Sequence, residues 1–140
     1  MKRSASAHWA GSGKEGTGSL TTQSGALSEV PYGFNTRFGD EKGTNPEELI
    51  AVAHAGCFTM ATSFALGKAG FTPESLDTKA TLTMEQEGDG FTITAIHLDL
   101  TAKVPGIDAD KFAEIATDAK ANCPVSKVLN AEITLDAKLG

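Results

Sequence analysis

The sequence contains no cluster of basic residues, although binding to a polyanion normally requires one. Its 12 lysines and arginines are scattered among 18 acidic residues, and the formal net charge is −6. We therefore expect neither nucleic acid nor an anionic membrane to be the main partner of this protein.

The N-terminal segment lacks the apolar stretch of a secretory signal. Lys2 and Arg3 are followed by the small and polar residues 4–8 (SASAH), whereas a signal peptide continues with a hydrophobic run. The chain has only two cysteines, Cys57 and Cys123, and thiols are normally kept reduced in the cytoplasm. These features predict a cytoplasmic protein.

Metal-binding spacings are also missing. The two cysteines are too far apart for a CxxC motif or a zinc knuckle, and no ligand spacing links His8, His54 and His97. We therefore predict no metal site.

The length and composition predict a single domain over residues 1–140. Hydrophobic residues make up 40% of the chain and charged residues 21%, which is ordinary for a globular protein. The first 40 residues are rich in Gly, Ser and Thr. β-like runs predict strands at residues 5–10, 17–23 and 26–30, and the last run resumes at residues 34–38.

A long helix is predicted over residues 46–68. Asn45 or Thr44 provides the N-cap, Pro46 suits the first helical position, and Gly70 ends the helix. Residues 49–67 contain no Asp, Glu, Lys or Arg, which is also typical of a membrane span. The polar residues and the many alanines within this stretch favour the buried helix of a soluble domain instead.

This helix is apolar nearly all round, so it has to be covered on more than one face. A sheet can cover one side. On the other side, the small residues Ala53, Gly56 and Ala61 allow a second helix to approach closely. That second helix can come from another copy of the chain.

The remainder predicts a β-hairpin over residues 80–102 with a bulge near Ala95, a helix capped by Asp108, a short helix after Cys123, and a C-terminal strand at residues 131–139. The inner face of the helix after Asp108 is Phe112, Ile115, Ala116 and Ala119. This order of elements predicts an α+β fold without a parallel βαβ unit.

The position of Cys123 favours a reactive thiol. Pro124 pushes the residue before it to extended geometry, which is the geometry of an N-cap. A sulfur at that place meets free backbone N–H groups and the positive end of the helix dipole, which favours the thiolate form. The alternative is a buried cysteine that ends one helix.

Cys57 lies in the middle of an apolar helix, where burial raises the pKa of a thiol and makes it inert. A reactive Cys57 therefore requires a cation from elsewhere in the fold. Arg37, between two phenylalanines, is the candidate, because a guanidinium stabilises a thiolate and binds a peroxide oxygen. The alternative role of Arg37 is a surface salt bridge.

Glu47 is the candidate partner of Arg37, through a bidentate ion pair. Ten helical residues span about 15 Å, so Glu47 cannot lie beside Cys57 of its own helix. A shared site requires Glu47 from an antiparallel second copy or an arginine that spans the gap. His54 lies three residues before Cys57 and could pair with it, but a lone histidine on a mostly apolar helix is more often a hydrogen-bonded core residue.

Several motifs resemble the OsmC/Ohr family. They are residues 31–38 (PYGFNTRF), 43–49 (GTNPEEL), 53–58 (AHAGCF), 122–126 (NCPVS) and 132–135 (EITL). The resemblance runs from about His8 to Leu139, and the run PYGFNTRF resembles the branch of osmotically inducible protein C more than the organic hydroperoxide resistance branch.

The resemblance implies an intertwined homodimer in which two long helices lie between antiparallel sheets. It also implies a thiol-dependent peroxidase that reduces organic hydroperoxides and hydrogen peroxide in oxidative and osmotic stress defence. By motif match, Cys57 is the peroxidatic and Cys123 the resolving cysteine, Arg37 activates the thiolate, and Glu47 orients Arg37. An external dithiol, such as a lipoyl protein, reopens the disulfide.

Two other functions fit the same residues. The cysteines could sense oxidation in a binding module that does not turn over. The chain could also be a dimeric carrier of a small molecule whose core thiols are inert.

Overall fold

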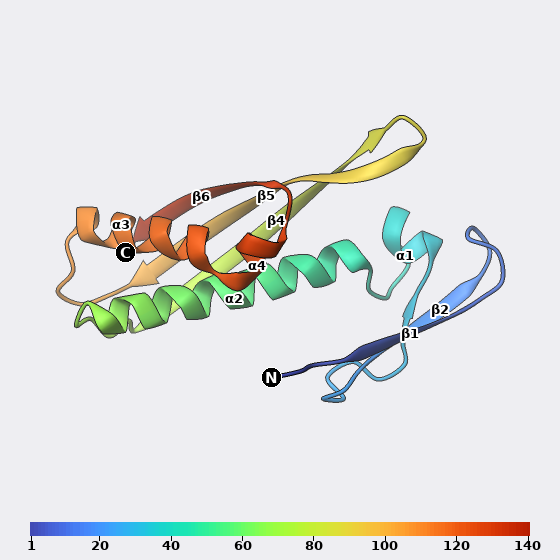
Figure 1. Ribbon diagram of the computed structural model, residues 1–140, viewed down its shortest axis with the longest axis horizontal. Coiled ribbons are helices and arrows are strands. Elements are labelled where there is room, and N and C mark those ends of the chain that lie inside the picture. The colour runs from blue at the N-terminus through green and yellow to red at the C-terminus, as the bar shows by residue number, and fades with distance from the viewer. The chain divides into compact units, whose positions relative to one another are not determined.

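The computed structural model describes residues 1–140, which divide into two compact units, Met1–Leu49 and Ile50–Gly140. The single domain that composition predicts stays a prediction. The chain forms an α+β fold in which each unit contains one three-stranded sheet, in the orders β1-β2-β3 and β4-β5-β6 (Figure 1).

The first unit is an antiparallel meander of β1 (Ala5–Ala10), β2 (Thr17–Thr22) and β3 (Val30–Tyr32). The rings of Trp9 and Tyr32 pack at 5.4 Å between centroids. Gly18 lies beneath both rings, and a Cβ on it would come within 2.4 Å of Tyr32 and 2.6 Å of Trp9. Its missing side chain therefore makes room for this aromatic pair.

Two sequence predictions in this unit are wrong. Residues 26–29 form bends, and only Val30 of this run belongs to a strand. Residues 34–38 form helix α1 (Phe34–Phe38) instead of a strand. The reason is local capping: the Gly33 N–H donates to the Thr36 hydroxyl at 2.8 Å, and the same hydroxyl donates to the Gly33 carbonyl at 3.0 Å.

Helix α2 (Pro46–Lys68) begins and ends where the sequence predicts. The Asn45 side chain accepts the Glu48 N–H at 2.8 Å, which satisfies one of the free donors of the first turn. At the other end Gly70 has φ +89°, and the Phe71 N–H returns to the Leu66 carbonyl at 2.9 Å. Of all the helices, α2 alone is long and apolar enough to span a membrane by these two measures.

The second unit contains the hairpin β4 (Ser75–Glu87) and β5 (Gly90–Lys103), helices α3 (Ala109–Asn122) and α4 (Pro124–Val128), and strand β6 (Glu132–Leu139). The hairpin register shifts where Thr83 faces Ala95 and Met84 faces Ile93. The extra residue confirms the predicted bulge near Ala95.

Strand β6 pairs with β5 in parallel, so the prediction of purely antiparallel sheets without a βαβ unit is wrong. Helices α3 and α4 carry the chain back to the end of the sheet where β5 begins, which makes β5-α3-α4-β6 one crossover unit. The sequence did not predict this crossover. The helices are short, and the alternation of apolar and polar residues in β6 is more typical of an antiparallel strand.

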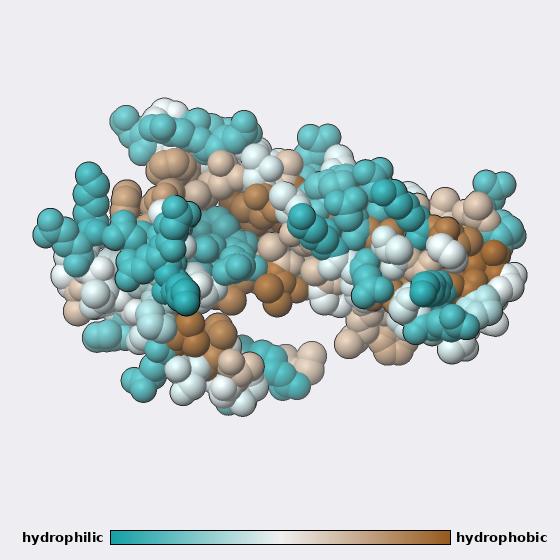
Figure 2. Space-filling view, turned by 180° about the vertical axis from the view of Figure 1, so that it is seen from behind, coloured by the Kyte–Doolittle hydropathy of each residue, from teal (hydrophilic) through white to brown (hydrophobic).

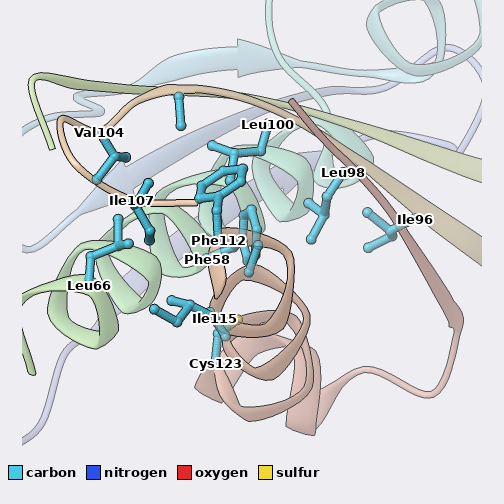
Figure 3. Packing of buried hydrophobic residues seen from close by; sticks show 13 residues of the cluster. Phe58, Leu66, Ile96, Leu98, Leu100, Val104, Ile107, Phe112, Ile115 and Cys123 are labelled. Carbon is cyan, nitrogen blue, oxygen red and sulfur yellow. The ribbon is translucent and has the colours of Figure 1, made fainter. Parts of the chain in front are cut away.

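The core of this unit lies between one face of the sheet and the helices (Figure 3). From Ile96 to Ala102, every second residue of β5 points into it, and the predicted inner face of α3 is buried as expected. The buried residues are Phe58, Leu66, Ile96, Leu98, Leu100, Ala102, Val104, Ile107, Phe112, Ile115, Ala116, Ala119 and Cys123.

Helix α2 buries a single stripe, His54, Phe58, Thr62 and Leu66, at four-residue spacing. Other apolar side chains of the helix remain on the surface: Val52 is 64% exposed, Met60 63% and Phe64 68%. Apolar surface is visible among the polar residues in Figure 2. The unit Ile50–Gly140 by itself thus covers only one side of a helix that is apolar nearly all round.

Candidate active site

Cys123 lies at the corner between α3 and α4, where it is the C-cap of one helix and the N-cap of the next. Its backbone is extended, with φ −61° and ψ 135°, as expected for a residue before proline. The sulfur accepts the Ser126 N–H at 3.3 Å, and the side chain is fully buried. The predicted N-cap position of Cys123 is confirmed.

Cys57 faces Cys123 from the half-buried side of α2, and both are free thiols. Burial raises the pKa of Cys57, the backbone N–H of Val125 opposes that rise, and the neighbouring Cys123 adds to it. The direction agrees with the sequence-based expectation for a cysteine in the middle of an apolar helix. The fold therefore brings together two sulfurs that are distant in the sequence.

His54 is a buried core residue that hydrogen-bonds to Ser126 rather than to Cys57. Its Nε2 lies 2.7 Å from the Ser126 Oγ, and that oxygen lies 3.2 Å from the Cys123 sulfur. Burial lowers the pKa of His54, and its Nδ1 has no hydrogen-bond partner. Ser126 was not among the predicted site residues. Its position could have indicated the contact, because the backbone N–H three residues after an N-cap commonly donates to the side chain of the cap.

Arg37 and Glu47 form the expected ion pair within one chain. The Nε and Nη2 of Arg37 both donate to Oε1 of Glu47, at 2.9 and 2.5 Å. The Glu47 side chain is only 14% exposed, and its Oε2 is buried without a hydrogen-bond partner. The pair therefore uses two guanidinium nitrogens but a single carboxylate oxygen.

Two further contacts position this ion pair. The Asn45 amide donates to the Thr36 carbonyl at 3.0 Å, which ties α1 to the start of α2. The Arg37 guanidinium lies 5.3 Å from the centre of the Phe38 ring, at cation-π distance. The expectation that aromatic neighbours pack on the arginine thus applies to Phe38.

The structure brings the predicted site residues together in two pairs. Arg37 and Glu47 lie in the unit Met1–Leu49, whereas Cys57 and Cys123 lie in the unit Ile50–Gly140. A common site for all four stays a prediction.

One group of side chains has the composition of a metal site. His97 Nε2 lies 3.6 Å from Asp99 and 3.2 Å from Asp136, and its Nδ1 lies 2.6 Å from the Thr134 hydroxyl. The group is on the outer face of the β5–β6 pair, opposite the core.

Comparison with known proteins gives consistent matches. The family model described as OsmC-like protein matches residues 39–138. The peroxiredoxin OsmC of Escherichia coli (strain K12) is 59% identical over 133 residues, which cover 95% of this chain and 93% of that protein. The organic hydroperoxide resistance protein-like 1 of Staphylococcus saprophyticus is 35% identical over 101 residues, covering 69% and 68% of the two chains.

Among solved structures, an OsmC-like protein of unknown function from Vibrio cholerae shares the fold. The TM-score is 0.78 at 16% sequence identity, and the match covers 98% of this chain and 99% of that one.

The buried imidazole predicts a pH-dependent stability. Because burial lowers the pKa of His54 in the folded state, the folded chain binds this proton less tightly than the unfolded chain. The stabilisation from a neutral His54 is complete above the unfolded value of about 6.5 and is lost as the pH falls below it. Between pH 7.5 and 5.5, the free energy of unfolding in urea should therefore decrease more for the wild type than for His54→Gln.

His8→Gln, a substitution of an exposed histidine on β1, is the matched control. Equal slopes of stability against pH for the wild type and His54→Gln would contradict the interpretation.

Proposed function

The chain belongs to the OsmC-like protein family, and from this premise we propose that it is a peroxidase that reduces hydroperoxides with Cys57 and Cys123 in stress defence. The observation that carries the proposal is the contact between two free thiols supplied by α2 and by the α3–α4 corner. The 59% identity to a protein named peroxiredoxin OsmC supports the same activity.

The proposed reaction has two steps. The Cys57 thiolate attacks the terminal oxygen of ROOH, the O–O bond breaks, and Cys57 becomes a sulfenic acid while ROH leaves after taking up a proton. Cys123 then attacks the Cys57 sulfur, the S–O bond breaks, and water and a disulfide form. An external dithiol reduces the disulfide in two exchange steps. The two sulfurs carry both electrons, so the proposed reaction calls for no metal or cofactor.

Arg37 supplies the charge that the first step needs. Burial raises the pKa of Cys57, so an apolar environment alone leaves the thiol protonated. A guanidinium stays charged at any physiological pH and can stabilise both the thiolate and the departing alkoxide. Glu47 orients Arg37 through their paired hydrogen bonds. The arginine belongs to the same chain or to a second copy.

A homodimer covers the exposed face of α2. The exposed apolar residues Val52, Met60 and Phe64 are accompanied by the exposed small residues Ala53 and Gly56. Apolar side chains around small ones suit close packing of two helices. We infer that the α2 helices of two copies pack together, and that the protein acts in the cytoplasm, where dithiol reductants are available.

The assignment of the two cysteines is tested with cumene hydroperoxide and excess dithiol. Cys57→Ser should lose turnover completely, because no sulfenic acid can form at the first position. Without dithiol, Cys123→Ser should still react once, and its intact mass should increase by one oxygen after one equivalent of peroxide. The wild type should instead lose two hydrogens.

Turnover of Cys57→Ser near the wild-type rate would refute the assignment. A wild type that reacts once and then stops in excess dithiol would indicate a redox sensor. Thiols that iodoacetamide labels only after unfolding would indicate a carrier.

The role of Arg37 is tested by the rate of sulfenic acid formation under single-turnover conditions. Arg37→Gln should slow this step by about 100-fold or more, which is the usual effect of removing one group that stabilises transition-state charge. Arg37→Lys should recover only part of the rate, since an ammonium lacks the planar fork. Arg3→Gln replaces the other arginine of the chain and is the control. Unchanged rates in Arg37→Gln would exclude the proposed activation.

The dimer is tested at Gly56. A Cβ on Gly56 meets no atom of its own chain within 4 Å, and leucine has a higher helix propensity than glycine by roughly 1 kcal/mol. Gly56→Leu should therefore stabilise an isolated chain but separate two closely packed helices. Sedimentation should show a mass near 14.5 kDa for Gly56→Leu and twice that mass for the wild type. Gly56→Ala should form a weaker dimer and give an average mass between these two. A dimer of unchanged affinity in Gly56→Leu would place the interface elsewhere.

A further inference from the structure

A row of polar side chains crosses the apolar interior between α2 and α4. His54 and Cys123 are fully buried, Ser126 is 9% exposed, and Ser126 joins the other two through contacts of 2.7 and 3.2 Å. Burial of a polar group is unfavourable unless it is hydrogen-bonded. The two-cysteine reaction proposed above uses neither His54 nor Ser126, so it does not explain why these polar side chains are buried next to Cys123.

The direction of the hydrogen bonds follows from the one atom without a partner. His54 Nδ1 is buried and unbonded. Buried N–H groups without an acceptor are rarer than unsatisfied acceptors, which assigns the single proton of the neutral imidazole to Nε2. Nε2–H then donates to the Ser126 oxygen. The hydroxyl proton of Ser126 is left to donate to its other neighbour, the sulfur of Cys123.

Cys123 therefore has two donors from a single residue. The Ser126 backbone N–H donates to the sulfur at 3.3 Å, and the Ser126 hydroxyl lies 3.2 Å from it. Hydrogen bonds to an anion are about twice as strong as those to a neutral acceptor. Both donors can therefore stabilise negative charge on the Cys123 sulfur when it develops.

We propose that Ser126 is a catalytic residue of the resolving step, in which its two donors stabilise the attacking sulfur of Cys123, and that His54 is a positioning residue that turns the Ser126 hydroxyl toward this sulfur. This inference rests on the proposed peroxidase function and deepens it. It separates the duties of the two thiols: Cys57 meets the peroxide, and the row His54–Ser126–Cys123 prepares the second nucleophile.

The resolving step conserves atoms, charge and electrons. Cys123 releases its proton to solvent, and its thiolate attacks the sulfur of the Cys57 sulfenic acid. The S–S bond forms, the S–O bond breaks, and the leaving hydroxide takes a proton from solvent to become water. One sulfur is oxidised and the other reduced by one electron each. When an external thiolate later opens the disulfide, the same donors stabilise Cys123 as the leaving group and direct the attack to Cys57.

The test separates the two chemical steps in the full-length protein. After mixing with one equivalent of cumene hydroperoxide, samples are quenched with dimedone, and intact masses give the sulfenic acid and the disulfide over time. Ser126→Ala and His54→Leu should prolong the lifetime of the Cys57 sulfenic acid about tenfold or more, as loss of a charge-assisted hydrogen bond implies. Formation of the sulfenic acid should change much less than its closure.

His54→Gln distinguishes positioning from packing, because the glutamine amide nitrogen can donate from near the place of Nε2. It should restore closure to within a few-fold of the wild type, whereas His54→Leu should not. Val128→Ala, an exposed substitution on α4, is the control. Thermal unfolding of each variant shows that it is folded.

The outcomes are distinct. If the wild type forms no sulfenic acid on Cys57, the proposed function fails. If it forms one and closes at the same rate in Ser126→Ala and His54→Leu, the peroxidase proposal stands and the relay is wrong. Equal closure rates for His54→Gln and His54→Leu would reduce His54 to a packing residue.

Discussion

The packing of the α3–α4 corner against α2 is the constraint on which the chemistry of this protein depends. Cys123 is held there by the backbone of two helices, since its N–H bonds the Ala119 carbonyl and its own carbonyl accepts the Lys127 N–H. The sulfur consequently has little freedom to move. Cys57 reaches it because the stripe of α2 that includes Phe58 and Leu66 packs into the same core.

Burial of this contact has two opposing effects on reactivity. It brings the sulfurs together and excludes water, but it also raises the pKa of Cys57 and so disfavours the anion that reacts. The protein therefore needs donors or cations at each sulfur. Val125 N–H is such a donor at Cys57, and Ser126 is one at Cys123. The two thiols therefore differ in their surroundings although they are chemically identical. Arg37 is the proposed cation for Cys57.

Local signals in the sequence predicted where most of the helices begin or end. The caps Asn45 and Asp108, the stop at Gly70 and the N-cap at Cys123 all appear as expected, because capping depends on residues within one turn of each other. The same kind of reasoning was wrong for residues 34–38. The aromatic and β-branched residues Phe34, Thr36 and Phe38 are typical of a strand, yet a single hydroxyl, that of Thr36, closes a short helix there.

The sequence by itself determined the long apolar helix, the two cysteines and the candidate pair Arg37 and Glu47, because each is a matter of residue type and local spacing. Only the tertiary structure decided that β6 runs parallel to β5, and that Ser126 joins His54 to Cys123. Such contacts link residues far apart in the chain. Their partners are selected by how helices pack on a sheet, and no periodicity within one segment encodes that choice.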